Sequence, residues 1–195
     1  MQVRLCLLAL AAVVALMPAT AQNNRENPRN SRGSADRLNA LQPEPMGETR
    51  IAHQVRHELV MLPYYGVFDN LAYSVNGGTV TLYGQVTRPS LKQDARNVVQ
   101  TIEGVEKVDN QIQVLPVSPM DDRIRLAEFR AIYSTPGLDR YALQAIPPIH
   151  IVVDNGHVTL VGVVASQSDK NLAAMRAKSV PGVFSVVNDL KVENR

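Results

Sequence analysis

Cysteine is nearly absent from this 195-residue chain, which has one, Cys6, and no tryptophan. A single thiol cannot close a disulfide bond within the chain, whatever the redox state of its compartment. The folded protein therefore has to be held together by packed apolar cores. We expect a protein without disulfide bonds.

An excess of charge is also missing. Lys and Arg number 20 against 18 Asp and Glu, which gives a net charge of +2 at pH 7. Neither half of the chain concentrates this small excess. Proteins that bind nucleic acid usually present a basic patch or stripe. The composition therefore excludes nucleic acid as a partner and predicts no strong attraction to anionic lipid.

Long apolar runs are lacking except over residues 5–17 (LCLLALAAVVALM). This run is shorter than the roughly 20 apolar residues of a helix that crosses a bilayer. Arg4 precedes the run, and the small residues Ala19 and Ala21 follow it, as in a secretory signal peptide. Cys6 lies too early to be a lipid-bearing cysteine after cleavage. We predict a signal peptide over residues 1–21 and export to the periplasm, with secretion beyond the cell as an open alternative.

Residues 22–45 (QNNRENPRNSRGSADRLNALQPEP) contain few apolar side chains. Such a segment cannot bury enough surface to offset the entropy lost on ordering. We predict a flexible leader, either a plain spacer or a tether to an envelope partner.

The most prominent feature of the sequence is an internal repeat. VNGGTVTLYGQV at residues 75–86 returns as VDNGHVTLVGVV at residues 153–164. The correspondence continues at the same offset of 78 residues, without a gap, through Gly104 and Gly182 to the end of each copy. A period of this length indicates a duplicated domain rather than a solenoid repeat. We place the first unit at residues 46–117 and the second at 120–195.

Each unit predicts the order helix–strand–strand–helix–strand, which is an α+β fold. The first helices are expected over 49–62 and 121–133, and the last strands over 105–115 and 183–192. The joint between the units, LPVSP, is short and stiff, so the units should touch. Three pairs of glycines are given structural roles. These are the hairpin turn for Gly78 and Gly156, close approach of a helix backbone or a strand bulge for Gly84 and Gly162, and a left-handed helix C-cap for Gly104 and Gly182.

These motifs resemble the BON domain (bacterial OsmY and nodulation). Its pattern is present as NGGTVTLYGQV…EGVEKVDNQIQV and again as DNGHVTLVGVV…PGVFSVVNDLKV, and the match covers most of residues 49–115 and 122–193. A signal peptide followed by two such units is similar to the layout of periplasmic OsmY-like proteins. The resemblance implies a three-stranded mixed sheet with two helices on one face in each unit. It also implies a non-catalytic module that binds phospholipid or another envelope component and is linked to osmotic or envelope stress.

No set of residues predicts an enzyme. The chain shows no nucleophile beside a base, and Gly77-Gly78 lies in a hairpin rather than in a phosphate-binding strand-to-helix loop. His53 and His57 have a spacing that can chelate a metal. The apolar stripe of their helix places them on the exposed side, and no third ligand is near. We expect no catalytic residues, no cofactor and no metal.

The loop LPYYGVFDNLAYSV, between the first helix and its strand, gathers four aromatic side chains. Tyr64 and Tyr65 could lie at a lipid headgroup boundary or stack on a ligand. Alternatively, Phe68 and one of these tyrosines cap the open end of the sheet.

The helix expected at 121–133 is apolar on two sides. One stripe is expected to face its own sheet: Leu126, Phe129 and Tyr133. Ile124 and Ile132 would then lie on the far side, which needs a second cover. That cover is the first unit, a partner protein or a membrane surface, in which case Arg125 would reach the headgroups.

The sequence therefore predicts an exported, non-catalytic, monomeric or weakly oligomeric protein that binds phospholipid or another envelope surface. A protein that docks on another envelope protein and a module that binds a small ligand or ion are the alternatives. The candidate lipid- or partner-binding residues are Ile124, Arg125, Ile132, Tyr64 and Tyr65.

Overall fold

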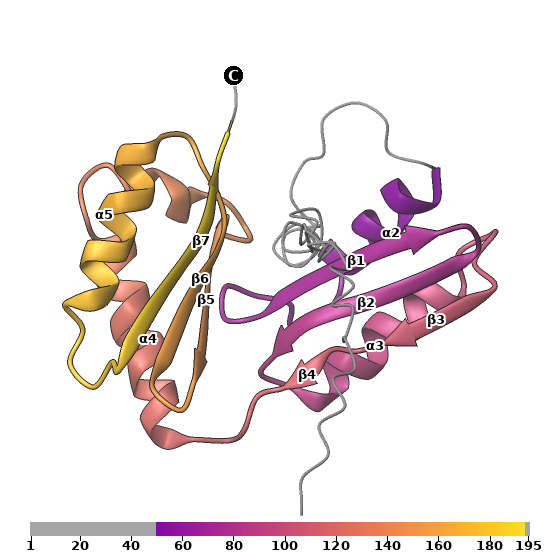
Figure 1. The fold of residues 1–195 in the computed structure, drawn as a ribbon, viewed down its shortest axis with the longest axis horizontal. Coiled ribbons are helices and arrows are strands. Elements are labelled where there is room, and N and C mark those ends of the chain that lie inside the picture. Colours follow the sequence, from indigo (N-terminus) through magenta and orange to yellow (C-terminus); the bar gives the residue numbers. More distant parts are fainter. Residues whose placement is uncertain (1–49, 194–195) are drawn as a thin grey trace, which may run out of the picture.

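The computed structural model describes residues 50–193, so the predicted signal peptide and leader lie outside the described residues. Two units lie side by side, each with one sheet and its helices (Figure 1). The predicted α+β fold of two tandem units with mixed sheets is confirmed.

The first unit contains helices α2 (Arg50–Val60) and α3 (Pro89–Gln100) and strands β1 (Asn70–Asn76), β2 (Thr79–Val86), β3 (Lys107–Asn110) and β4 (Gln113–Val114). Strand β1 runs antiparallel to β2, and β3 and β4 follow one another along its other side in the parallel direction. The last strand, expected over 105–115, is divided into β3 and β4, which keep one register along β2, and Gln111 N–H between them donates to the Leu82 oxygen at 2.9 Å. The Ile112 N–H donates to Asn110 Oδ1 at 3.2 Å, and the Ile112 side chain is buried.

The second unit contains helices α4 (Pro119–Tyr133) and α5 (Gln167–Lys178), a 3-10 turn η1 (Asp139–Leu143) and strands β5 (Ile149–Asp154), β6 (His157–Val164) and β7 (Ser185–Val192). Strand β5 pairs antiparallel with β6, and β7 pairs with β6 in the parallel direction over its whole length. The second sheet thus repeats the first with an unbroken last strand.

Two-residue hairpin turns join the first two strands of each unit, as predicted. In the second unit both Asn155 (φ +50°) and Gly156 (φ +78°) are left-handed, which matches a type I′ turn. In the first unit only Gly77 (φ +59°) is left-handed, and Gly78 is not, which matches type II′. The same connection is therefore made with two turn geometries.

Gly84 and Gly162 lie inside β2 and β6 at φ +116° and +133°. An added Cβ would overlap the carbonyl oxygen of Asn70 at Gly84 and that of Pro148 at Gly162. The backbone that approaches so closely is the start of the neighbouring strand, so the expected approach of a helix backbone is wrong.

Gly104 and Gly182 are left-handed, at φ +92° and +91°, but they do not cap the helices. Helix α3 ends at Gln100 and α5 at Lys178, several residues earlier. Each glycine instead occupies the third position of a tight turn, which in the first unit is closed by Val105 N–H donating to the Ile102 oxygen at 3.1 Å. A positive φ at this position is the requirement of a type II turn.

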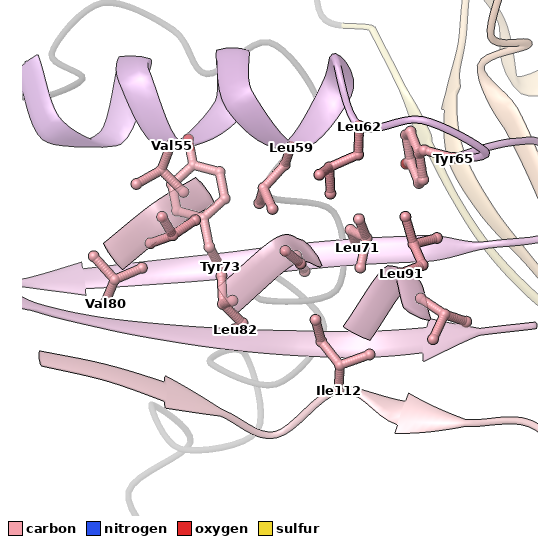
Figure 2. Packing of buried hydrophobic residues seen from close by; sticks show 14 of the residues in the cluster. Val55, Leu59, Leu62, Tyr65, Leu71, Tyr73, Val80, Leu82, Leu91 and Ile112 are labelled. Carbon is pink, nitrogen blue, oxygen red and sulfur yellow. The ribbon is translucent and has the colours of Figure 1, made fainter. Parts of the chain in front are cut away.

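The core of the first unit lies between its helices and its sheet (Figure 2). The sequence predicts an apolar stripe of Ala52, Val55, Leu59 and Leu62 on the first helix, and the structure confirms it. Val55, Leu59 and Leu62 are buried, Ala52 packs against the same core, and Leu62 lies just after the end of α2. Alternating residues of β2 are buried and half-buried, whereas the first four residues of β1 are all buried, so the face away from the helices is covered only in part, at Asn70 and Ala72.

The orientation predicted for α4 is wrong in part. Ile124 and Ile132, expected on the far side, are 2% and 0% exposed and belong to the core of their own unit. Leu126, expected in that core, is 51% exposed. Tyr133 is buried as expected, and Phe129 packs against the edge of the core.

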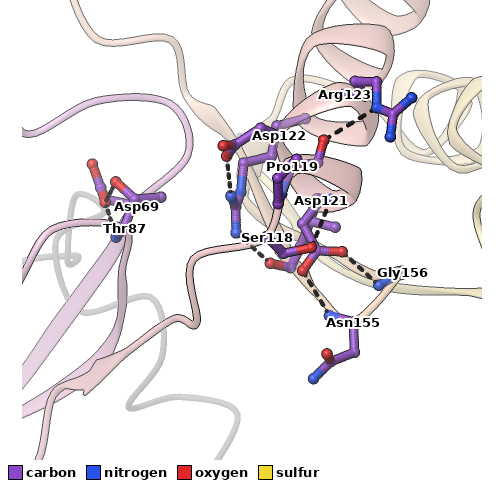
Figure 3. Close-up of polar contacts among 11 residues, drawn as sticks. Asp69, Thr87, Ser118, Pro119, Asp121, Asp122, Arg123, Asn155 and Gly156 are labelled. Atoms are coloured by element: carbon purple, nitrogen blue, oxygen red, sulfur yellow. Dashed lines mark hydrogen bonds and ion pairs between the residues drawn. The ribbon is translucent and has the colours of Figure 1, made fainter.

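The start of α4 is tied to the hairpin turn of its own unit (Figure 3). Ser118 caps the helix by accepting from Asp121 N–H at 3.2 Å. The buried Asp121 carboxylate accepts from the N–H groups of Asn155 at 3.0 Å and Gly156 at 2.8 Å. The residue therefore fixes the helix to the sheet as well as lying at the favourable end of the helix dipole.

Ser166 and Asp169 have the spacing of a capping box, and helix α5 begins there, since Ser166 accepts from Asp169 N–H at 3.1 Å. In a capping box the acidic side chain would accept from the backbone N–H of the cap residue. Here the Asp169 carboxylate accepts instead from the Tyr141 hydroxyl at 2.9 Å and from Arg140. The acidic residue of the cap thus holds the 3-10 turn η1 against the helix.

The two units touch, as the short joint predicted. Phe68 of the first unit packs against the second core, and Ile146, which corresponds to it at the repeat offset, packs against the first core. Leu115 covers Val152 and Val161 on the face of the second sheet that carries no helices. At Phe68 and Ile146 each unit therefore inserts a side chain against the core of the other, whereas at Leu115 only the first unit covers the second.

Candidate binding surface

The residues proposed for binding do not form one site. Of the five, only Tyr64 is exposed, at 72% of its surface. Tyr65, Ile124, Arg125 and Ile132 are all buried.

Tyr64 belongs to a small exposed surface at the end of α2, which we call the Tyr64 surface and define by Val60, Met61, Tyr64 and Arg88. Met61 is 67% exposed and Val60 37%. The Arg88 guanidinium carbon lies 4.9 Å from the centroid of the Tyr64 ring, which is within reach of a cation–π contact. Tyr64 is held at φ +67°, an uncommon backbone conformation for a residue with a side chain.

Tyr65 contacts the second unit instead of solvent, which corrects its prediction. Its ring stacks on His150 with centroids 5.6 Å apart and an interplanar angle of 26°, and its hydroxyl oxygen lies 3.5 Å from His150 Nε2. Burial lowers the pKa of His150 to about 4, so the imidazole is neutral at neutral pH. Burial, with the nearby Asp69 charge, raises the pKa of Tyr65. The pair is a neutral part of the contact between the units.

Arg125 is also corrected, because it cannot reach a membrane from its buried position. Its guanidinium pairs with Asp122 at 2.6 Å and donates to the backbone oxygen of Val153 at 2.7 Å. Since Ile124 and Ile132 also lie in the core, this face of α4 packs within its own unit and is not available to a partner. The structure shows that Ile124 corresponds to Ile51 of the first unit, since an added Cβ on Gly104 would meet Ile51 and one on Gly182 would meet Met120 and Ile124.

Glu128 was not singled out from the sequence, although it lies four residues after Ile124 and four before Ile132. Its side chain is fully buried, and among the described residues neither carboxylate oxygen finds a hydrogen-bond partner. Burial raises its pKa to about 8, so the group is mostly protonated at neutral pH. Val55 lies four residues after Ile51, and Glu128 lies four residues after Ile124. Because Ile51 and Ile124 correspond, Glu128 of the second core corresponds to Val55 of the first.

Residues 50–193 contain neither a metal-binding cluster nor a membrane-spanning helix. His53 and His57 are exposed on α2, as predicted. No group of three or more His, Cys, Asp or Glu side chains in that range could hold a metal ion. No helix in the same range has the length and apolar character needed to cross a bilayer.

Comparison with known proteins gives one relative along nearly the whole chain. Osmotically-inducible protein Y of Escherichia coli (strain K12) is 28% identical over 193 residues, which covers 94% of this chain and 92% of that protein. The likeness therefore includes both units.

Two solved structures of CdsD, a structural protein of the Type III secretion system of Chlamydia trachomatis, are similar at 12% identity. They cover 74% and 76% of this chain, and 93% and 100% of the CdsD chains. The TM-scores are 0.29 and 0.27, too low to bear on the function of this chain.

A family model described as the BON domain matches residues 47–116 and again residues 138–194. The second match begins after α4, the helix whose orientation the sequence mispredicted. The two matches together take in more than half of the chain, and the chain belongs to the BON domain family.

Proposed function

We propose that this chain is an exported, non-catalytic binding protein of the osmotic stress response, acting at phospholipid or other surfaces of the cell envelope. The observation that supports this most is the 28% identity to Osmotically-inducible protein Y, which extends over 94% of the chain. The predicted signal peptide supports export.

The Tyr64 surface is the proposed point of contact with lipid. Tyrosine suits the headgroup level of a bilayer because its ring is apolar and its hydroxyl is polar. Met61 and Val60 would enter the apolar boundary beside it, and Arg88 would meet phosphate. A surface of this size gives weak, reversible attachment, and nothing in it requires a chemical reaction.

Vesicle flotation tests this proposal. Purified protein is mixed with vesicles of phosphatidylcholine alone or with phosphatidylglycerol, at low and moderate salt. We expect the wild type to float, and the double variant Tyr64→Ser/Met61→Ser to stay at the bottom of the gradient. Leu126→Ser is the matched control, since Leu126 is a comparably exposed apolar residue on α4. Arg88→Gln should weaken flotation only with the anionic vesicles at low salt.

A folded wild type that floats with neither vesicle contradicts the lipid proposal. An envelope protein captured by the wild type, but not by Tyr64→Ser/Met61→Ser, would then support docking on a protein partner. Equal loss of flotation in the Leu126→Ser control would mean that binding is not located at the Tyr64 surface.

A further inference from the structure

The two sheets have four edges, and three of them either lie at the contact between the units or are made of short strands. Strands β1 and β5 lie against one another at the contact between the units, and Ile151 N–H of β5 donates to the oxygen of Val67, which precedes β1, at 2.8 Å. The outer edge of the first sheet consists of the short strands β3 and β4, of four and two residues. Shortening or covering an edge is how proteins prevent unwanted strand pairing.

The fourth edge, β7, is long and unbroken. All eight of its residues pair with β6, from Ser185 opposite His157 to Val192 opposite Val164. Within residues 50–193, β6 is the only strand that pairs with β7. The strand contains neither proline nor glycine, which would interrupt an edge. Its remaining protection is charge, because Asp189 and Lys191 disfavour pairing with a strand that does not match them.

The backbone groups on the outer side of β7 can be identified by alternation. Glu193 N–H donates inward to Val164 at 2.9 Å, so the N–H and C=O groups of every second residue, including Asn188, Leu190 and Val192, point away from β6. Leu190 N–H makes a 3.4 Å contact with Asn188 Oδ1, at the long end of the hydrogen-bond range. A stronger backbone acceptor would replace this contact.

The charged side chains of β7 are complementary to those of a second, antiparallel copy of the same strand. Asp189 and Lys191 are two residues apart, so they lie on the same face of the sheet. If a second β7 lies antiparallel with Leu190 opposite Leu190, Asp189 of each strand is opposite Lys191 of the other. The two-fold symmetry of this arrangement gives two such opposite-charge pairs, one on each side of Leu190. Val187, which is 49% exposed, lies on the same face and would lose exposure in such a pair.

We propose that β7 is the surface through which two copies of this chain associate, paired antiparallel about Leu190 to join their three-stranded second sheets into one sheet of six strands. The contact is isologous, so it closes at a dimer and does not extend into a fibre. It does not involve the Tyr64 surface, and it holds whether or not the protein binds lipid.

Charge exchange provides the first test, read by sedimentation equilibrium over micromolar to millimolar concentrations. The wild type should move from one to two chains per particle. Asp189→Lys or Lys191→Asp alone creates two like-charge pairs and should weaken association by about tenfold. The double exchange Asp189→Lys/Lys191→Asp restores both opposite pairs and should restore the dimer. Gln111→Lys, at the corresponding position of the edge formed by β3 and β4, is the matched control and should change nothing.

Cysteine cross-linking provides the second test and reads the register directly. Opposite residues of a non-hydrogen-bonded antiparallel pair have Cα atoms about 4.5 Å apart, within the range that a disulfide spans. In a Cys6→Ser background, Asp189→Cys mixed with Lys191→Cys should cross-link under mild oxidation. Either variant alone should cross-link much less, because its own cysteines are not opposite one another.

Three results would overturn the proposal. The first is a wild type that stays monomeric at every concentration, which would leave β7 open to an extended segment of another protein. The second is a dimer that both single exchanges leave intact. The third is equal cross-linking in the mixture and in the separate variants. Far-UV circular dichroism confirms that each variant is folded.

Discussion

The two units share one backbone plan and distribute their polar side chains in opposite ways. In the first unit the α2 position that faces the core is Val55, and the open face of the sheet carries polar residues such as Thr81 and Gln85. In the second unit the corresponding core position is Glu128, and the open face carries Val152 and Val161, which the first unit covers. Duplication has therefore produced one unit with polar residues on the open face of its sheet and one unit with apolar residues there that its neighbour covers.

The largest expected effect tests what the units share. Gly162→Ala places a methyl group on the Pro148 carbonyl oxygen, and Gly84→Ala does the same at Asn70. Overlap and an unfavourable positive φ together should destabilise the affected unit by about 3 kcal/mol or more. Urea titration followed by circular dichroism should show one early transition in each variant. A mild effect in either would mean that the strand can move away from the glycine.

The second prediction concerns the difference between the two cores, which is Glu128 in the second unit and Val55 in the first. Burial raises the pKa of Glu128 from 4.5 to about 8, so the folded state keeps a proton that the unfolded state releases between these values. Glu128 should therefore lower the stability of the second unit as pH rises from about 4.5 to about 8, by at most roughly 1.4 kcal/mol per pH unit. Burial of His150, which lowers its pKa from 6.5 to about 4, has the opposite effect below about pH 6.5, so the net fall should appear between about pH 6.5 and 8. Glu128→Val should abolish this slope and stabilise the unit by a few kcal/mol, most strongly above pH 8.

Urea titrations at pH 5, 7 and 9 check this, with Val55→Glu as the reciprocal change. That variant should bring the same pH slope to the first unit, at a loss of stability. Equal slopes in the wild type and in Glu128→Val would show that the carboxyl group finds a partner in solution.

The third and smallest prediction tests the dependence of the second unit on the first. Leu115→Ser removes the side chain that covers Val152 and Val161 and should destabilise the second unit by about 1–2 kcal/mol, with little change in the first. Val117→Ser, in the same joint but 96% exposed, is the control and should have no effect. Hydrogen exchange at the Val152 and Val161 amides measures the difference. Equal exchange in both variants would contradict the one-sided cover.

Most of the fold could be predicted from the sequence because its signals are local. Gly77-Gly78 and Asn155-Gly156 mark hairpins through their own backbone preferences, and the stripe of Val55, Leu59 and Leu62 has a single apolar side. The constant repeat offset then required both copies to fold alike. These features depend on neighbours in the chain, which a sequence displays directly.

The candidate site could be predicted far less well, because its residues depend on contacts between distant segments. Helix α4 is apolar on two sides, so its periodicity alone could not decide between Leu126 and Ile124 as the core residue. Tyr64 and Tyr65 are adjacent and chemically identical, yet one is exposed and the other stacks on His150, 85 residues away. Only the arrangement of the two units separates them.

The reciprocal packing of Phe68 and Ile146 makes the molecule comparable to a dimer enclosed in one chain. The joint of residues 115–119 holds the halves at an effective concentration in the millimolar range, as short linkers do. An interface too weak to hold two separate proteins together is then sufficient, and it cannot be lost by dilution. Because the two partners are always present in equal number, each half is free to evolve a surface that only the other half needs.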